Sequence, residues 1–357
     1  MITALVAIVV IYLFVFVAYV AVPGRWVSGY VLDPKTALPL RYHLNGLRVF
    51  FLSIVVWTLA CHYGLLPWDF LYTERYALLG FACVIGLCFT LAIVLPAPPV
   101  NGIGSDLYLG RLENPQWLNG RIDAKMFLYL IGATLLELNL LSFAAHHILL
   151  YPHDYSPGVL LYVGLSSFFL VEYLFFEQVH LYTYDFVAER VGFKLGWGCL
   201  VFYPFYYGVG LWTQAERPNP HVSSLWLGGC AALFFSGWVL ARGANLQKFW
   251  FKKDPTHKAF GVLIPESLEH NGKRVLVSGF WGLSRHINYL GEITMATALT
   301  LSLGWPQSLG PWLYPAYYLA LLFPRQYFDD QRCAKKYGPL WDSYCRKVRW
   351  RIIPFVY

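Results

Sequence analysis

The stretch from Ile2 to Val22, ITALVAIVVIYLFVFVAYVAV, contains no charged residue and decides the fold class. A helix needs about 20 apolar residues to cross the hydrocarbon core of a bilayer, and this stretch has that length. It lacks the basic n-region of a secretory signal peptide, and its apolar core is longer than a typical h-region. We therefore expect it to be a retained first membrane-spanning helix.

Similar apolar windows recur along the whole chain, which is 57% hydrophobic and only 13% charged. A soluble domain carries about 25% charged residues. The windows predict spans at 2–22, 47–67, 76–96, 126–150, 158–180, 194–212, 223–241, 287–304 and 309–324. Since the region 270–300 could form one broken span or two, we predict an all-α, polytopic membrane protein with about nine to ten transmembrane helices.

Basic residues are concentrated after residue 241 and in the C-terminal segment 325–357. Because Lys and Arg are enriched in cytoplasmic loops, we expect both segments to face the cytoplasm. The net charge of +7 is explained by these segments together with attraction to anionic lipid. Nucleic-acid binding is disfavoured because no basic stripe interleaved with aromatic residues lies on a soluble module. We expect a single membrane domain over residues 1–357 with a basic cytoplasmic C-terminal segment.

A polar, glycine-rich run, LVSGFWGLSRHINYLGE, covers residues 276–292 and leads directly into an apolar span. Non-helical backbone at membrane depth is tolerated only where protein or a water-filled cavity covers it. Arg285, His286, Asn288 and Tyr289 at the mouth of a span indicate a binding site for a polar ligand. The alternative is an ordinary interfacial belt of Trp, Tyr and Arg.

The C-terminal segment has a cationic helix face. Its ionisable residues recur at helical spacing: Arg325, Asp329, Arg332 and Lys336. Gly338 predicts the end of this helix, and Trp341 and Tyr344 belong to a second short helix. Such a face, flanked by aromatic residues, suits a phosphate-rich nucleotide. A solvated or lipid-headgroup face is the alternative.

An intramembrane polar set occupies the end of the window at 158–180 and continues just beyond it. Its members are spaced as on one helix face: Tyr173, Glu177, His180 and Tyr184, with Asp185 adjoining. Ionisable residues inside a membrane cost several kcal/mol and by default suggest function, here a proton donor. Glu137, near the centre of the fourth span, is another such residue. A hydrogen-bonded structural cluster remains the alternative.

Several common site types are missing from the sequence. No Gly-x-Gly-x-x-Gly fingerprint and no P-loop occurs, so a bound dinucleotide would need a non-Rossmann site. No metal-ligand spacing of His or Cys occurs, and we predict no metal. The seven cysteines form no Cys-x-x-Cys pair and are expected to be small buried hydrophobic residues.

Three motifs in the C-terminal third carry a family resemblance: VSGFWG at 277–282, RHINYLG at 285–291 and CAKKYGPLWDSYC at 333–345. Shorter matches precede them at 45–46, 110–111, 114–115, 183–185, 192–193 and 242–248. With these motifs in this order, the chain from about residue 41 onward resembles the membrane sterol reductases of the ergosterol and cholesterol pathways. The ending resembles the delta(14)-sterol reductases most closely.

The resemblance implies a ten-span helical fold with NADPH as hydride donor. It implies cofactor contacts at Lys248, Lys252, Leu276, Trp281, Asn288, Tyr289, Arg325, Asp329, Cys333, Ala334, Lys335, Lys336, Tyr337 and Tyr344. Residues 1–240 would supply spans around a sterol pocket, and 241–357 the cofactor-binding half. Two departures occur: Lys252 replaces the usual Arg, which changes a bidentate phosphate grip to a point charge, and Ile287 replaces a Pro.

The implied reaction is NADPH-dependent reduction of a sterol carbon–carbon double bond, closest to C14(15), with reduction at C7 or C24 as alternatives. An isolated alkene accepts hydride only after protonation, and we expect Tyr184, Glu177 and Asp185 to form the acid relay. The sterol would enter from the bilayer of the endoplasmic reticulum or of a bacterial inner membrane. Two other classes stay open, an isoprenylcysteine-type carboxyl methyltransferase and a non-catalytic sterol-binding membrane protein.

Overall fold

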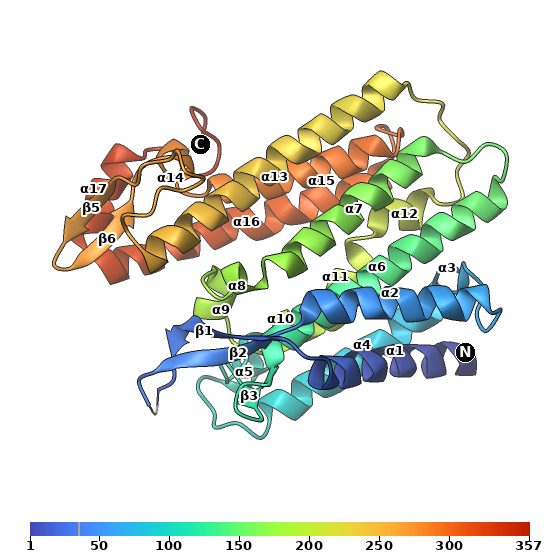
Figure 1. Ribbon diagram of the computed structural model, residues 1–357, viewed down its shortest axis with the longest axis horizontal. Coiled ribbons are helices and arrows are strands. Elements are labelled where there is room, and N and C mark those ends of the chain that lie inside the picture. Colours follow the sequence, from blue (N-terminus) through green and yellow to red (C-terminus); the bar gives the residue numbers. More distant parts are fainter. Residues whose placement is uncertain (35) are drawn as a thin grey trace. The chain divides into compact units, whose positions relative to one another are not determined.

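The computed structural model describes residues 1–34 and 36–357, most of which are helical (Figure 1). Backbone contacts divide the chain into two compact units, Met1–Asn219 and Pro220–Tyr357, and each is described by itself. Within the described residues, five helices are long and apolar enough to cross a membrane: α1 (Ile2–Ala21), α4 (Arg75–Val94), α6 (Ala124–Leu150), α7 (Pro157–Phe175) and α13 (Ser224–Lys253). A mostly helical, multi-span membrane protein is thereby confirmed, and the count of nine to ten spans stays a prediction.

Helix α6 is the centre of the first unit. It packs against α1, α2 (Gly46–His62), α7 and α11 (Tyr203–Tyr206). Of its most apolar window 83% is buried inside the protein, against 28% for α1 and for α4. A helix that is apolar on all sides is buried by other helices or by lipid. Helix α6 is therefore the core helix, whereas α1 and α4 leave most of their surface to lipid.

The predicted span 194–212 is a succession of short helices. They are α10 (Phe193–Trp197), the π-helix η1 (Gly198–Phe202), α11 and α12 (Val209–Gln214). Pro204 has no N–H to offer to the carbonyl of Leu200 one turn earlier, and the hydroxyl of Tyr12 donates a hydrogen bond to that carbonyl instead. The carbonyl of Pro204 accepts a bond of 2.9 Å from Asn139 of α6. Side chains of neighbouring helices thus replace the backbone bonds that the interruption removes.

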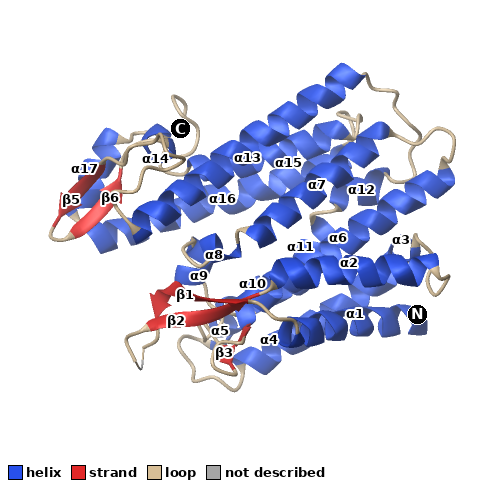
Figure 2. Cartoon of the chain, viewed as in Figure 1, coloured by secondary structure: helices blue, strands red, loops and turns tan. Residues whose placement is uncertain are grey.

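In the part of the chain that the structure describes, three two-stranded antiparallel sheets lie in the connections, none of which was predicted from the sequence (Figure 2). They pair β1 (Arg25–Leu32) with β2 (Pro39–Leu44), β3 (Gln116–Trp117) with β4 (Ile122–Asp123), and β5 (Ser267–His270) with β6 (Lys273–Leu276). The β5–β6 turn is Asn271-Gly272, with φ of 50° and 71°, as the tight primed hairpin turn requires. That signal was readable in the sequence.

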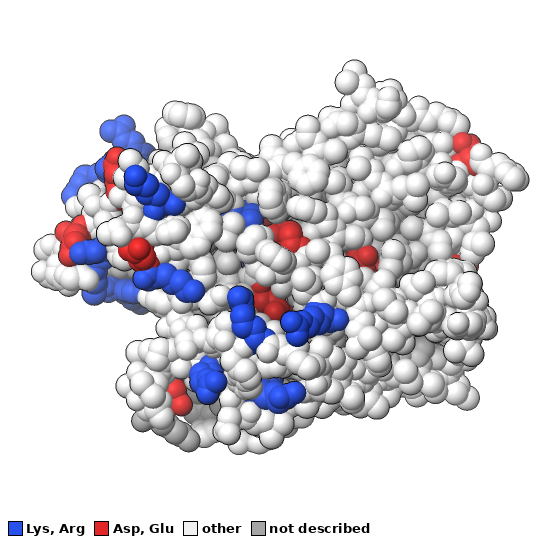
Figure 3. Space-filling view, viewed as in Figure 1, with Lys and Arg blue, Asp and Glu red and all other residues white. Residues whose placement is uncertain are grey.

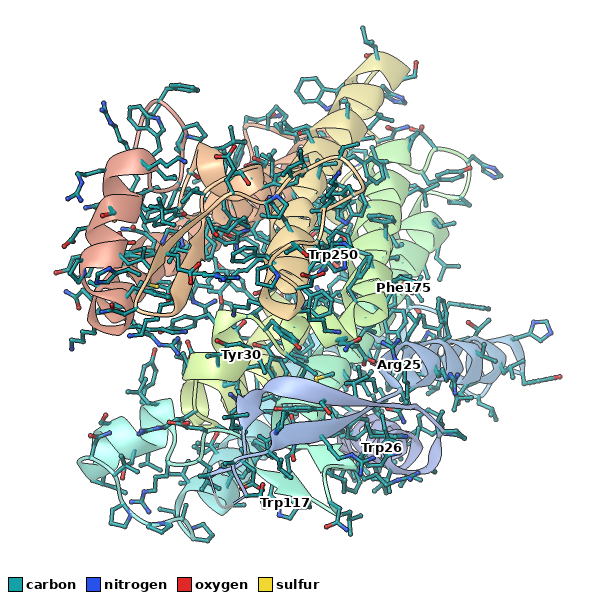
Figure 4. The ribbon with its side chains drawn as sticks, turned by 60° about the vertical axis from the view of Figure 1, so that its left-hand side comes forward. Arg25, Trp26, Tyr30, Trp117, Phe175 and Trp250 are labelled. Atoms are coloured by element: carbon teal, nitrogen blue, oxygen red, sulfur yellow. The ribbon has the colours of Figure 1, made fainter. Side chains whose placement is uncertain are left out.

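The β1–β2 hairpin covers the segment of unit 1 around residues 182–186. Trp26 and Tyr30 project from β1 (Figure 4), and the Tyr30 ring lies 5.5 Å from the ring of Tyr182. The ring of Tyr42 on β2 lies 6.4 Å from that of Phe186. Phe186 belongs to α9 (Tyr184–Ala188), and Tyr182 lies just before it. The hairpin therefore shields this short helix. The remaining short helices of the unit are α3 (Phe70–Thr73), α5 (Ile103–Leu109) and α8 (Glu177–His180).

In the second unit, α13, α15 (Ile287–Ser302) and α16 (Leu309–Tyr337) run side by side (Figure 1). The small elements α14 (Phe280–Leu283), α17 (Pro339–Lys347) and the β5–β6 hairpin gather at one end of α13 and α16. Gly338, with φ of 56°, ends α16, and α17 follows, as the sequence predicted. Helix α16 continues through Pro324, the predicted end of the span, into the polar segment that ends at Tyr337.

Gly132 of α6 provides a test of the packing in unit 1. A Cβ at this position would lie 2.5 Å from the Tyr203 ring and 2.7 Å from the Cys199 carbonyl oxygen. We expect Gly132→Ala to destabilise the protein by about 1–3 kcal/mol through overpacking. Gly164→Ala on α7 is the matched control, because a Cβ there meets nothing within 4 Å. Thermal unfolding in detergent measures both, and equal midpoints for the two variants would contradict the packing described.

Candidate functional site

The three residues predicted to donate protons lie on two short helices that follow α7. Glu177 begins α8, and Tyr184 and Asp185 form the first turn of α9. The prediction that Tyr173, Glu177, His180 and Tyr184 share one continuous helix face is wrong, because α7 ends at Phe175. The His180 ring stacks on the Tyr173 ring at 3.8 Å, and its Nε2 lies 3.0 Å from the Tyr173 carbonyl oxygen. The imidazole thus satisfies a carbonyl at the end of α7.

Glu177 is buried and lies beyond the end of α7. Its Oε1 accepts a hydrogen bond of 2.9 Å from the backbone N–H of Gly46, the first residue of α2. Burial raises the pKa of Glu177 to about 8, although the Gly46 N–H and the charge of Arg25 oppose the shift. Glu177 therefore carries a proton at neutral pH for most of the time, which suits a proton reservoir.

Asp185 and Tyr184 are half-buried at the start of α9. The backbone carbonyl of Asp185 accepts a hydrogen bond of 2.8 Å from Nζ of Lys125, on α6. Lys125 was not among the site residues predicted from the sequence. A lone Lys at the start of an apolar span is typical of an interfacial anchor, and only the folded chain shows that it is buried.

In unit 2, the residues implied to bind a cofactor form a cationic group at one end of the helices. Burial, followed by the like charges of Lys248 on α13 and of Lys336 and Arg332 on α16, lowers the pKa of Lys252, and the carboxylate of Asp329 opposes this shift. Lys and Arg side chains are dense at the end of this unit that carries β5, β6 and α17 (Figure 3). Several cations with one carboxylate form a surface suited to phosphate groups. The structure thus brings together residues that lie about 80 positions apart in the sequence.

Trp281 of α14 connects three of these elements. Its indole N–H donates a hydrogen bond of 2.8 Å to the carbonyl of Ala244, and its own carbonyl accepts one of 3.2 Å from the Tyr344 hydroxyl. The Nζ of Lys248 lies 4.8 Å from the centre of its ring. Leu276 packs in the same buried cluster. Trp281 is therefore held from two sides and forms a fixed wall beside Lys248.

Cys333 and Tyr344 belong to the interior of this end of unit 2. Tyr344 is buried with Trp341, and Cys333 and Tyr337 pack against that cluster. Burial, followed by the charge of Asp329, raises the pKa of the Cys333 thiol to about 12, so the thiol stays neutral. Ala334, Lys335 and Lys336 are exposed on α16.

The remaining predicted contacts lie at the start of α15 and on α16. Asn288 is half-buried, and its Oδ1 is a buried acceptor to which no described group donates a hydrogen bond. The Tyr289 ring stacks on the His286 ring at 4.9 Å. Arg325 lies one helical turn before Asp329 and is half-buried. An unsatisfied amide oxygen at the mouth of a helix is the kind of group that a ligand N–H or O–H satisfies.

A charge network adjoins Asn288, and the carboxylate at its centre, Asp330, was missing from the predicted site. Arg285 NH1 lies 3.4 Å from the Asp330 carboxylate and 2.8 Å from the Cys345 sulfur, and His286 Nε2 lies 3.7 Å from Asp330. The carbonyls of Trp350 and Arg351 accept bonds from the N–H groups of residues 285 and 286. The C-terminal segment thereby fixes the turn before α15. The sequence singled out Asp329, and its neighbour Asp330 gave no separate signal.

Comparisons with known proteins identify the family of the chain. The family model described as "Ergosterol biosynthesis ERG4/ERG24 family" matches residues 3–357. The chain is 30% identical to the delta(14)-sterol reductase of Arabidopsis thaliana, over 98% of this chain and 95% of the relative. It is 33% identical to delta(14)-sterol reductase TM7SF2 of Mus musculus, over 96% and 82%. It is 32% identical to the delta(14)-sterol reductase of Methylotuvimicrobium alcaliphilum, over 94% and 79%.

Asp330 provides a test of the charge network. We expect Asp330→Asn to destabilise the protein by about 2 kcal/mol, because it leaves the Arg285 guanidinium buried without a carboxylate. Asp342→Asn is the control, since Asp342 is an exposed aspartate on α17. Thermal unfolding in detergent compares the two variants with the original protein. A loss of similar size in both would show that net charge, and not the charge network, is responsible.

Proposed function

Because the chain belongs to the ergosterol biosynthesis ERG4/ERG24 family, we propose that it is a delta(14)-sterol reductase. It is a multi-pass membrane oxidoreductase that reduces the C14 double bond of a sterol. The observation that carries this proposal is similarity over nearly the whole chain to delta(14)-sterol reductases, at 30–33% identity. Family membership favours a reductase over a carboxyl methyltransferase. Reduction at C7 or C24 is the second candidate, since such enzymes share most of the same motifs.

A reductase of this kind needs a hydride donor, and we propose NADPH. Two features of unit 2 fit a phosphate-bearing dinucleotide: the cationic group formed by Lys248, Lys252, Arg332 and Lys336, and the unsatisfied Oδ1 of Asn288. The cations would hold the phosphates, and the Asn288 amide would accept a hydrogen bond from the base or ribose. Trp281, fixed by Ala244 and Tyr344, would form a wall of the site. When bound, the nicotinamide supplies a hydride.

The proton comes from the chain itself. We assign the donor to Tyr184, with Glu177 as the reservoir that restores its proton and Asp185 as the ionised neighbour. The Tyr184 O–H bond breaks as its proton forms a C–H bond with one alkene carbon, and the positive charge develops on the other carbon. In a sterol diene this cation is tertiary and allylic. The Asp185 carboxylate stabilises it until hydride forms the second C–H bond.

The membrane setting suggests how the sterol reaches the site and which side of the membrane the cofactor site faces. A sterol is dissolved in the bilayer, so we propose that it enters laterally between helices and not from water. Basic residues are dense in the last turn of α13 and in 325–357, and by the positive-inside rule this supports a cofactor site at the cytoplasmic side. Cytosolic NADPH is available there.

A panel of sterols differing in double-bond position, with product analysis by mass spectrometry, tests the reaction. We expect NADPH-dependent saturation at C14 and little at C7 or C24. Tyr184→Phe should lower kcat by about a hundredfold or more, because it removes the general acid. Tyr63→Phe is the control, since Tyr63 is 73% exposed. Turnover by Tyr184→Phe at the original rate would refute the acid assignment.

Lys252 tests the cofactor choice. We expect Lys252→Gln to weaken NADPH binding by about tenfold or more, because one charge-assisted contact to phosphate is lost. NADH lacks the 2′-phosphate, and its binding should change much less. Lys258→Gln, which removes an exposed Lys from the following loop, is the control. Quenching of Trp fluorescence measures affinity for both nucleotides, and equal losses for NADPH and NADH would contradict a 2′-phosphate contact.

A further inference from the structure

Lys125 has an unusual environment for a lysine. It lies in the first turn of α6, and its side chain is fully buried. Its Nζ donates to three backbone carbonyls, of Asp185 at 2.8 Å, Phe186 at 3.2 Å and Glu189 at 2.7 Å. An ammonium group has three N–H donors, so all of them are used. A buried charge is tolerated only where it is paired and hydrogen-bonded in this way.

The three carbonyls lie in and just after α9. Helix α9 has five residues, Tyr184–Ala188, and too few internal hydrogen bonds to hold itself. The carbonyls at a helix end have no backbone partner, and Lys125 supplies their donors. Lys125 therefore fastens the segment that carries Tyr184 and Asp185 to the core helix of unit 1.

The base of this fastening is itself fixed. Asp123, the N-cap of α6, accepts a hydrogen bond of 2.9 Å from the Met126 N–H and another of 3.0 Å from the Gln116 side chain. The Lys125 backbone is thus held by a capped helix start, and its side chain reaches α9 from a rigid support. A shift of α9 relative to α6 would break three hydrogen bonds at once.

Lys125 is also the cation shared by a cluster of carboxylates. The acidic groups that act on it are Asp123, Asp185, Glu189 and Glu113. Two of these have a further cation: Glu189 lies 2.6 Å from Lys194, and Glu113 lies 3.7 Å from Arg190. Asp123 is held by the hydrogen bonds of the helix cap. Asp185, next to Tyr184, is thus one of the carboxylates on which the charge of Lys125 acts, and its backbone carbonyl is also bonded to the Lys125 ammonium.

We propose that Lys125 is a positioning residue for sterol reduction, which holds α9 and keeps Asp185 ionised beside Tyr184. This inference rests on the proposed function. It assigns the two neighbouring residues of α9 their different protonation states: Tyr184 gives a proton, and Asp185 stays charged. The fully buried ammonium, bonded to the backbone of Asp185, is the group that separates these roles.

Steady-state kinetics of the full chain in detergent test the proposal. We expect Lys125→Met to lower kcat by about a hundredfold, because α9 loses its anchor. Without the cation, Asp185 takes up a proton more readily, so the acid limb of the kcat–pH profile should move to higher pH by about one unit. Lys125→Arg keeps the charge, and its acid limb should stay in place even if kcat falls. Lys258→Met, on the exposed loop, should change neither quantity.

NADPH affinity separates positioning from general damage. We expect Lys125→Met to bind NADPH as the original chain does. Loss of NADPH binding in Lys125→Met, or unchanged kcat and acid limb, would overturn the proposal. If Lys125→Met does not fold, a displaced acid limb in Lys125→Arg would overturn it and an unmoved one would support it. If the original chain reduces no sterol, the proposed function itself has failed, and Lys125 is then not the cause.

Discussion

The structure depends on satisfying backbone hydrogen bonds where helices break inside or beside a bilayer. An unsatisfied backbone group in hydrocarbon costs several kcal/mol, because no water replaces the lost partner. Unit 1 meets this constraint with side chains from other helices. The hydroxyl of Tyr12 donates a hydrogen bond to the Leu200 carbonyl, and the side chain of Asn139 donates one to the Pro204 carbonyl. The Asn45 amide donates to the carbonyls of Tyr19 and Val22 at the end of α1. These contacts allow the short, irregular segments on which polar chemistry depends.

Hydropathy predicted the long helices because their apolar windows are a local property. Helices α1, α4 and α6 begin and end within two residues of the predicted limits. The break after α7 could not be predicted in this way, since apolar residues continue through Phe175 and Phe176. It is fixed by tertiary contacts, such as the bond from Gly46 to Glu177, between residues 131 positions apart. The Asn271-Gly272 turn was local and readable, and it was overlooked.

The two parts of the candidate site differ in how far the sequence could define them. On α16, helical spacing alone places Asp329, Arg332 and Lys336 on one face. That Lys252 of α13 lies near them came from family resemblance, because spacing says nothing about contacts between distant helices. Neither helical spacing nor family resemblance indicated Lys125. Its three acceptors are backbone carbonyls, which leave no trace in the side-chain pattern.

The chemistry explains why the acid group belongs on short helices rather than on α6 or α7. Protonation of an alkene and stabilisation of the resulting cation need a protonated group and an ionised group side by side. Two such groups on a regular spanning helix would both face low dielectric, and both would favour the neutral form. In the proposed mechanism, the consecutive residues Tyr184 and Asp185 at the start of α9 differ in protonation because the Lys125 ammonium is bonded to the backbone of Asp185. Under this proposal, an anchored break in the helix makes opposite protonation states compatible at neighbouring positions.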